Sequence, residues 1–131
     1  MAQVTGTNDG EFLIGTDDAD IIDGLDGDDV LLGVGGDDII NGDAGVDALQ
    51  GGDGNDTLNG GDGDDVLSGD NSFFGLLGAD VLTGGTGADT FFWTVGSDGH
   101  STAAMRDRVT DFTGAGLAGG DLLQLSLPFD M

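Results

Sequence analysis

The sequence contains no cysteine and no lysine, and its only histidine is His100. The missing cysteines exclude a disulfide scaffold and a thiolate metal site. One histidine cannot build a two-histidine metal site, and glycine-rich segments without lysine do not match a phosphate-binding loop. No stretch approaches the roughly 20 consecutive apolar residues of a membrane span. We therefore expect neither catalysis nor a membrane span in this chain.

Basic residues are almost missing as well. Arg106 and Arg108 stand against 26 acidic residues, of which only Glu11 is a glutamate, and the formal net charge is −24. Such a field repels nucleic acid and anionic membranes, so neither is an expected partner. Charge this dense is typical of disorder, yet 37% of the residues are hydrophobic. Bound cations that neutralise the aspartates would reconcile the two facts, and dense hard oxygen donors suit calcium best.

The aspartates recur with a period of nine residues. A hydrophobic residue follows each aspartate by two positions, and a glycine precedes it by five. The aspartates are Asp20, Asp29, Asp38, Asp47, Asp56, Asp65, Asp80 and Asp89; the hydrophobic residues are Ile22, Leu31, Ile40, Leu49, Leu58, Leu67, Leu82 and Phe91; the glycines are Gly15, Gly24, Gly33, Gly42, Gly51, Gly60, Gly75 and Gly84. Such a period indicates a repeat architecture in which stacked units share one core.

Each repeat divides into a glycine-rich half and an apolar half. We number the glycine as position one, so that the aspartate is position six and the hydrophobic residue is position eight. Glycines allow positive φ angles and let carbonyls point inward, so positions one to six are expected to form a turn. Positions seven to nine are expected to form a three-residue strand with its central side chain inward. One turn plus one strand reverses the chain, so each repeat should stack on the next repeat but one.

Two units show the pattern in full, with GGDGNDTLN over Gly51–Asn59 and GGDGDDVLS over Gly60–Ser68. Both match the G-G-x-G-x-D-x-U-x signature of calcium-binding β-roll repeats, where U is hydrophobic. Over about residues 6–92 the chain resembles the repeats-in-toxin (RTX) family, also called hemolysin-type calcium-binding proteins. The resemblance implies an all-β fold, a right-handed parallel β-roll or β-solenoid, that binds about five to seven calcium ions.

The resemblance also implies which residues hold calcium. In this family an ion takes carbonyls two and four and the aspartate of one turn, and carbonyls one and three and the aspartate of the turn stacked on it. The implied sets are Thr16, Asp18, Asp20, Gly33, Gly35 and Asp38; Leu25, Gly27, Asp29, Gly42, Ala44 and Asp47; Val34, Gly36, Asp38, Gly51, Asp53 and Asp56; Asp43, Gly45, Asp47, Gly60, Asp62 and Asp65; and Gly61, Gly63, Asp65, Gly84, Thr86 and Asp89, with Asp80 at an interrupted turn. Parallel strands lie about 4.8 Å apart, roughly twice a calcium–oxygen distance, so one ion can touch both turns.

The pattern breaks at two places. The register slips by six residues between Ser68 and Gly75. Either residues 69–74 are inserted between repeats, or a turn begins at Gly69 and is completed at Gly78, which would keep the chain in phase. Residues 1–14 form a degraded first repeat with Glu11 in place of the aspartate, and we expect an N-terminal cap there. The regular roll is expected over residues 15–92.

Residues 93–131 leave the repeat. Three short strands are expected, at residues 89–93, 106–112 and 121–126, between glycine-rich loops. This segment is similar to the one that follows the repeats in serralysin-type proteases and alginate-epimerase R-modules, and a solenoid end needs a cap. We therefore expect a small C-terminal β cap. Its Asp107, Asp111 and Asp121 are interpreted either as a further calcium site or as solvated loop acids.

The expected function is that of a non-catalytic calcium-binding module. The resemblance implies a secreted, extracellular protein exported by type I secretion machinery, with calcium-dependent folding outside the cell that supports an attached catalytic or adhesive domain. The alternative is a calcium-dependent adhesive or polysaccharide-binding module, such as an R-module of an alginate epimerase. His100 is expected to be a loop residue without a catalytic role.

Overall fold

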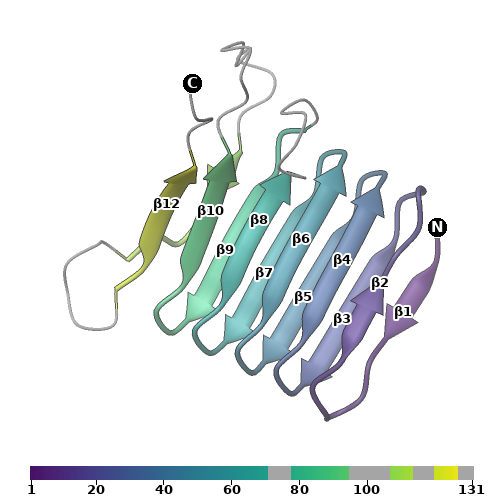
Figure 1. The fold of residues 1–131 in the computed structure, drawn as a ribbon, viewed down its shortest axis with the longest axis horizontal. Helices are drawn as coiled ribbons and strands as arrows, with labels where there is room; N and C mark the ends of the chain where they lie inside the picture. Colours follow the sequence, from purple (N-terminus) through teal and green to yellow (C-terminus); the bar gives the residue numbers. More distant parts are fainter. Residues whose placement is uncertain (71–77, 95–106, 114–119, 127–131) are drawn as a thin grey trace.

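The computed structural model describes residues 1–70, 78–94, 107–113 and 120–126 (Figure 1). The strands are β1 (Gln3–Thr5), β2 (Phe12–Ile14), β3 (Ile21–Asp26), β4 (Val30–Gly35), β5 (Ile39–Ala44), β6 (Ala48–Asp53), β7 (Thr57–Asp62), β8 (Val66–Asp70), β9 (Val81–Thr86), β10 (Thr90–Thr94), β11 (Arg108–Val109) and β12 (Leu122–Ser126). The described residues include no helix, and thus none long and apolar enough to cross a lipid bilayer.

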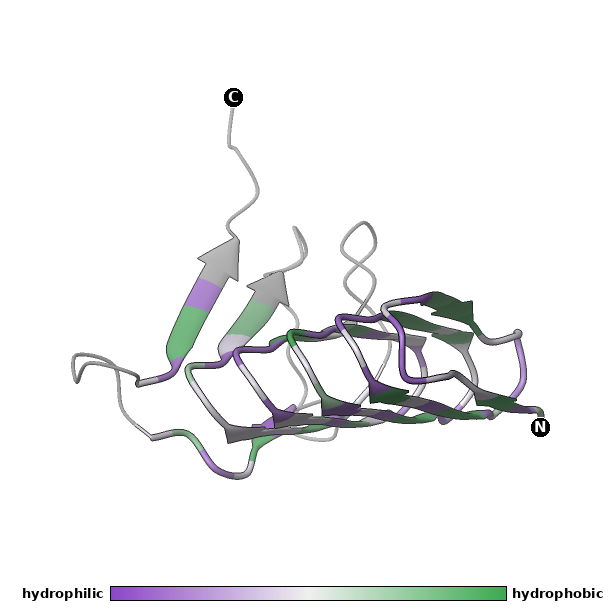
Figure 2. Cartoon of the chain, turned by 90° about the horizontal axis from the view of Figure 1, so that it is seen from below, coloured by the Kyte–Doolittle hydropathy of each residue, from purple (hydrophilic) through white to green (hydrophobic). Residues whose placement is uncertain are grey.

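Successive strands alternate between two parallel sheets. One six-stranded sheet has the order β1-β3-β5-β7-β9-β11, and the other has the order β12-β10-β8-β6-β4-β2. Along the first sheet Gln3 pairs with Ile21 and Ile21 pairs with Ile39, so each step from β1 to β5 advances the chain by two repeats. Figure 2 shows the chain coiling between the two layers. The prediction of a parallel β-roll is confirmed.

The core of the roll is a single row of side chains from position eight of each repeat. The row consists of Ile22, Leu31, Ile40, Leu49, Leu58, Leu67, Leu82 and Phe91, each at most 2% exposed. Full burial of such a side chain stabilises a fold by about 1.5–3 kcal/mol. The flanking positions seven and nine point outward because side chains alternate along a strand. One inward residue per strand makes this core thin, so the stability of the turns matters more than in most folds.

Most strands are longer than the expected three residues. In β3 the pairing with β5 runs through Ile21, Ile22 and Asp23 and resumes at Leu25 and Asp26, beyond the skipped Gly24. The glycine-rich halves of stacked repeats therefore also lie in register. The expected three-residue strand was too short because stacking brings the backbones of the turns, and not only those of the strands, within hydrogen-bonding distance.

The register slip falls inside a turn. Asp70 pairs with Gly52, and Gly78 lies so close to Gly54 that an added Cβ would collide with the Gly54 carbonyl. Both ends of the interrupted turn thus stack on the turn that begins at Gly51. The chain returns in phase at β9, which pairs with β7 through Val81 and Thr57. Residues 71–77, including Phe73 and Phe74, lie outside the described residues.

The tail adds one strand to each sheet. Arg108 of β11 pairs with Val81, and Leu122 of β12 pairs with Thr90. Val109 packs against the core, and the Phe112 ring lies 6.2 Å from the Phe91 ring in a tilted arrangement. These strands therefore extend the roll by a further coil. His100 and Arg106 lie outside the described residues.

Candidate metal centres

The repeat aspartates form two continuous ladders inside the roll. In one ladder the backbone N–H of Asp20 donates to Asp38 Oδ1 and that of Asp38 to Asp56 Oδ1; in the other Asp29 donates to Asp47 and Asp47 to Asp65, all at 2.8 Å. These carboxylates are at most 2% exposed. The aspartate at position six thus joins each turn to the turn stacked on it through one of its two oxygens.

The second carboxylate oxygen has no such partner at four aspartates. Oδ2 of Asp29, Asp38, Asp47 and Asp65 is buried and has no hydrogen-bond partner among the described residues. Between described residues, ion pairs form only at the amino terminus of Met1. A buried carboxylate without a partner is strongly unfavourable. A row of such oxygens is the arrangement that a bound cation would compensate.

Each unpartnered oxygen lies beside a main-chain carbonyl from the stacked turn. A Cβ added to Gly24 would lie 2.6 Å from Asp29 Oδ2 and 2.8 Å from the Gly42 carbonyl oxygen. A Cβ on Gly42 would lie 2.5 Å from the Gly60 carbonyl oxygen and closer still to Asp47 Oδ2. Position one is therefore glycine because two oxygens from different turns occupy the space where a side chain would begin.

Positions two and four of these turns have an unusual backbone conformation. φ is positive at position four in Gly27, Gly36 and Gly45, and also at position two, where non-glycine residues stand: Leu25 (81°), Val34 (91°) and Asp43 (73°). This conformation costs an L-residue about 1–2 kcal/mol. The Val34 and Gly36 carbonyl oxygens are directed at the stacked Gly52 and Gly54. The turns thus tolerate strain to direct carbonyls along the stack.

The structure brings together most of the residues predicted to hold calcium. Each of the last four predicted sets spans two stacked turns, because the register pairs Leu25 with Asp43, Val34 with Gly52, Asp43 with Gly61 and Gly61 with Gly85. Position-three carbonyls such as Ala44 O accept a hydrogen bond from the stacked N–H, here Gly27 at 2.8 Å, and keep a second lone pair. No three or more His, Cys, Asp or Glu side chains converge within the described part of the chain. Each predicted set contains two carboxylate ligands, the aspartates at position six, and its other oxygens come from the main chain.

Comparison with protein families matches residues 5–40, 32–67 and 67–99 to the RTX calcium-binding nonapeptide repeat (4 copies). The chain belongs to this RTX family. A comparison with curated proteins finds no match. The matched family is defined by a calcium-binding repeat and not by a catalytic domain.

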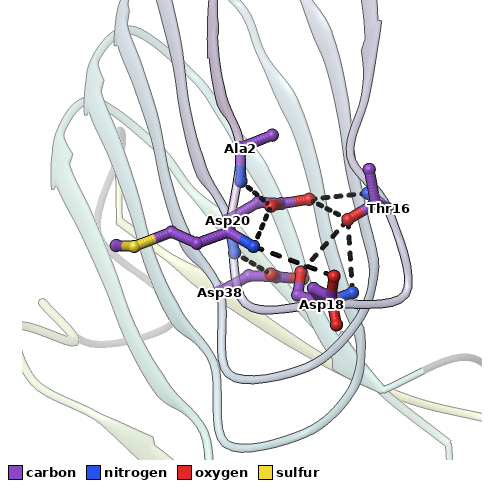
Figure 3. Close-up of polar contacts among 6 residues, drawn as sticks. Ala2, Thr16, Asp18, Asp20 and Asp38 are labelled. Atoms are coloured by element: carbon purple, nitrogen blue, oxygen red, sulfur yellow. Dashed lines mark hydrogen bonds and ion pairs between the residues drawn. The ribbon is translucent and has the colours of Figure 1, made fainter.

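The first predicted RTX site differs from the others (Figure 3). Oδ2 of Asp20 accepts hydrogen bonds from the backbone N–H of Thr16 at 2.6 Å and from the Thr16 hydroxyl at 2.8 Å. Its Oδ1 accepts the N–H of Ala2. The Asp20 carboxylate is therefore already satisfied by the chain itself, whereas Asp38 on the turn stacked against it has an unpartnered oxygen.

The pKa values also distinguish Asp20 from several aspartates of the later turns. Burial raises the pKa of Asp38, Asp47 and Asp89 above the ordinary value and raises the pKa of Asp65 to about 6. Hydrogen bonds from Ala2 and Thr16 instead hold the pKa of Asp20 below the ordinary value. One N–H donor thus does not offset burial at Asp38, Asp47 and Asp65, whereas the donors around Asp20 do.

The tail aspartates continue both ladders, which sequence reasoning missed. The N–H of Asp80 donates to Asp107 Oδ1 and that of Asp89 to Asp121 Oδ1, at 3.0 and 3.2 Å. Asp111 accepts the N–H groups of Gly84 and Gly85 at 3.0 and 2.8 Å. The available signal was the pattern Asp-x-hydrophobic, which survives as Asp107-Arg108-Val109 and Asp121-Leu122-Leu123 although the glycines are lost. Both earlier interpretations left out this role as ladder rungs.

Proposed function

We propose that this RTX chain is a module whose folding is coupled to calcium binding at sites between stacked turns. The observation that carries the proposal is the row of buried, unpartnered Oδ2 atoms at Asp29, Asp38, Asp47 and Asp65. The raised pKa of Asp65 has the same origin, since burial opposes its negative charge. Inside the fold each of these carboxylates accepts a single N–H, so a bound cation would stabilise its charge.

The proposed ligands are those of the last four sets given above. In each set one turn supplies carbonyls two and four and its aspartate, and the stacked turn supplies carbonyls one and three and its aspartate. The unpartnered oxygens and the carbonyls beside them support this assignment. Calcium accepts about six to eight oxygens at flexible geometry, which suits a set of six with two carboxylates. Asp80 is proposed to serve the interrupted turn, and the total of about five to seven ions stays a prediction.

The free energy of calcium binding is large enough to determine whether the chain folds. A ligand at about 100 times its dissociation constant stabilises the folded state by about 2.7 kcal/mol per site. Four such sites would contribute about 11 kcal/mol, which equals the whole stability of a typical domain. Without calcium the ionised aspartates repel one another, and the thin core cannot offset this. Binding and folding are then one event.

We further propose that the module is secreted and folds outside the cell. An expanded, calcium-free chain suits passage through type I secretion machinery, and calcium-rich surroundings would then order it. The family match and the row of buried, unpartnered carboxylate oxygens support this proposal. The module would stabilise a catalytic or adhesive domain attached to it.

Circular dichroism tests the central claim. In chelator we expect the spectrum of an unfolded chain, and on addition of calcium a cooperative change to β structure that chelator reverses. A matched titration with magnesium controls for general charge screening, because magnesium demands a rigid octahedral shell. A chain that is fully β in chelator would contradict the proposal. Titration of the calcium-loaded module with alginate and with neutral glycans tests the alternative of a polysaccharide-binding module.

A further inference from the structure

The first coil of the roll satisfies its carboxylates without a cation. Thr16 donates its N–H and its hydroxyl to Asp20 Oδ2 at 2.6 and 2.8 Å. In the preceding turn Thr7 does the same for Glu11, with its N–H to Oε2 at 2.6 Å and its hydroxyl to Oε1 at 3.0 Å. In both turns a threonine at position two supplies donors to the carboxylate at position six.

The carboxylates nevertheless occupy the same place as in the later turns. A Cβ on Gly15 would lie 3.0 Å from Asp20 Oδ2 and 2.5 Å from the Gly33 carbonyl oxygen, as a Cβ on Gly24 would lie between Asp29 and Gly42. The Oδ2 atoms of Asp20 and Asp29 therefore differ in their hydrogen-bond donors and not in their position within the turn. At Asp29 that oxygen has no donor, and at Asp20 it has two.

The backbone of this turn differs as well. Positions two and four of the Gly15 turn are Thr16 and Asp18, and φ is positive at neither, whereas it is positive at both positions of the turns that begin at Gly24, Gly33, Gly42, Gly51, Gly60 and Gly84. The Thr16 carbonyl accepts the Gly35 N–H at 3.2 Å, and the Thr16 hydroxyl, which donates to Asp20, lies 3.4 Å from the Asp18 carbonyl. The turn at Gly15 therefore lacks the backbone conformation that directs the carbonyls of positions two and four along the stack in the later turns.

We propose that threonine hydroxyl groups replace calcium in the first coil, so that the turns at Gly6 and Gly15 form a metal-independent end of the roll and calcium binding begins at Gly24. The inference rests on the proposed calcium function and removes one predicted set, Thr16, Asp18, Asp20, Gly33, Gly35 and Asp38, from it. Threonine at position two acts as an internal donor where later turns have leucine, valine, aspartate or glycine.

A matched pair of substitutions tests the inference. Asp20→Asn and Asp29→Asn both neutralise a buried aspartate that accepts an N–H from the first coil, from Ala2 in one case and Glu11 in the other. Bound calcium is counted by native mass spectrometry and by titration calorimetry at saturating calcium. We expect Asp20→Asn to hold the same number of ions as the wild type and Asp29→Asn to hold one fewer. Loss of an ion in Asp20→Asn would overturn the inference.

A gain-of-site variant gives an independent test. Thr16→Gly together with Asp18→Gly restores the sequence GGDGAD and frees Asp20 Oδ2, so we expect one additional ion. Asp17→Gly adds a glycine at position three of the same turn, where the exposed Asp17 belongs to no proposed ligand set, and its ion count should equal that of the wild type. An unchanged count in the double variant would mean that the wild type already holds that ion, which overturns the inference. If the double variant does not fold, the pair at Asp20 and Asp29 decides. A wild-type chain that binds no calcium would instead refute the proposed function.

Discussion

The substitution Asp47→Asn is expected to have opposite effects on the stability of the fold in chelator and in calcium. One Asp47 oxygen accepts the Asp29 N–H at 2.8 Å, and the other is buried without a partner. Asparagine keeps the acceptor for that N–H and removes the charge. In chelator the variant should be more compact than the wild type, because a buried and uncompensated carboxylate is gone. In calcium it should be less stable, because a carboxylate ligand is lost.

The size of the loss in calcium follows from the number of sites. Asp47 belongs to two proposed ligand sets, and each occupied site contributes about 2.7 kcal/mol when calcium is at about 100 times the dissociation constant. Loss of one or both ions therefore destabilises the fold by about 3–5 kcal/mol. At about 4 °C per kcal/mol for a domain of this size, Tm should fall by about 10–20 °C.

Asp43→Asn is the matched control. Asp43 carries the same charge and is exposed, and only its main-chain carbonyl is a proposed ligand. Its φ of 73° is one that asparagine adopts readily. Calcium titrations followed by circular dichroism, with thermal melts in calcium and in chelator, compare the two variants with the wild type. If the calcium midpoint and Tm of Asp47→Asn coincide with those of Asp43→Asn, the reasoning is refuted.

Three further outcomes are expected. Gly42→Ala should destabilise the calcium-bound fold by about 1–3 kcal/mol in urea unfolding, because its Cβ would meet the Gly60 carbonyl oxygen at 2.5 Å. Gly35→Ala is the control and should be nearly neutral, because the atoms nearest to its Cβ lie at 3.8 Å. Equal effects of the two substitutions would contradict the steric argument. Leu58→Ala should cost about 2–5 kcal/mol in the same assay since Leu58 is fully buried, and the exposed β7 neighbour Thr57→Ala serves as its control. The raised pKa of Asp65, about 6, means that the calcium-free fold is favoured at low pH and loses this contribution as pH rises through about 6. In calcium-free buffer the content of β structure should therefore increase as the pH falls from about 7 to about 5, and a pH-independent spectrum would disprove the link.

Much of the fold is encoded locally. Because one residue in nine faces the core and one in nine ends each turn, the sequence alone identifies every core side chain from Ile22 to Phe91 and every aspartate of the repeat ladders. The two-repeat offset between stacked strands follows from one reversal of the chain per repeat. These features are predictable because each repeat meets only its neighbours, so local spacing decides long-range contacts.

Other features depend on which atoms meet across the stack. Asp107 and Asp121 follow Asp80 and Asp89 on the ladders at two different separations in sequence, neither of them a two-repeat step. No period therefore reveals that they complete the ladders. The strand length was underestimated for the same reason, since the backbones of the turns pair only after stacking.

The sequence by itself determined the family, the β-roll, the core and the row of aspartates at position six, because the nine-residue spacing specifies all of them. Only the tertiary structure decided which carboxylates keep an unpartnered oxygen. Asp20 and Asp29 occupy the same position of the repeat, yet one receives two donors from Thr16 and the other has an unpartnered oxygen. That difference arises because a hydroxyl and a turn conformation, which the repeat pattern does not specify, place donors within hydrogen-bonding distance of one buried carboxylate and not of the other.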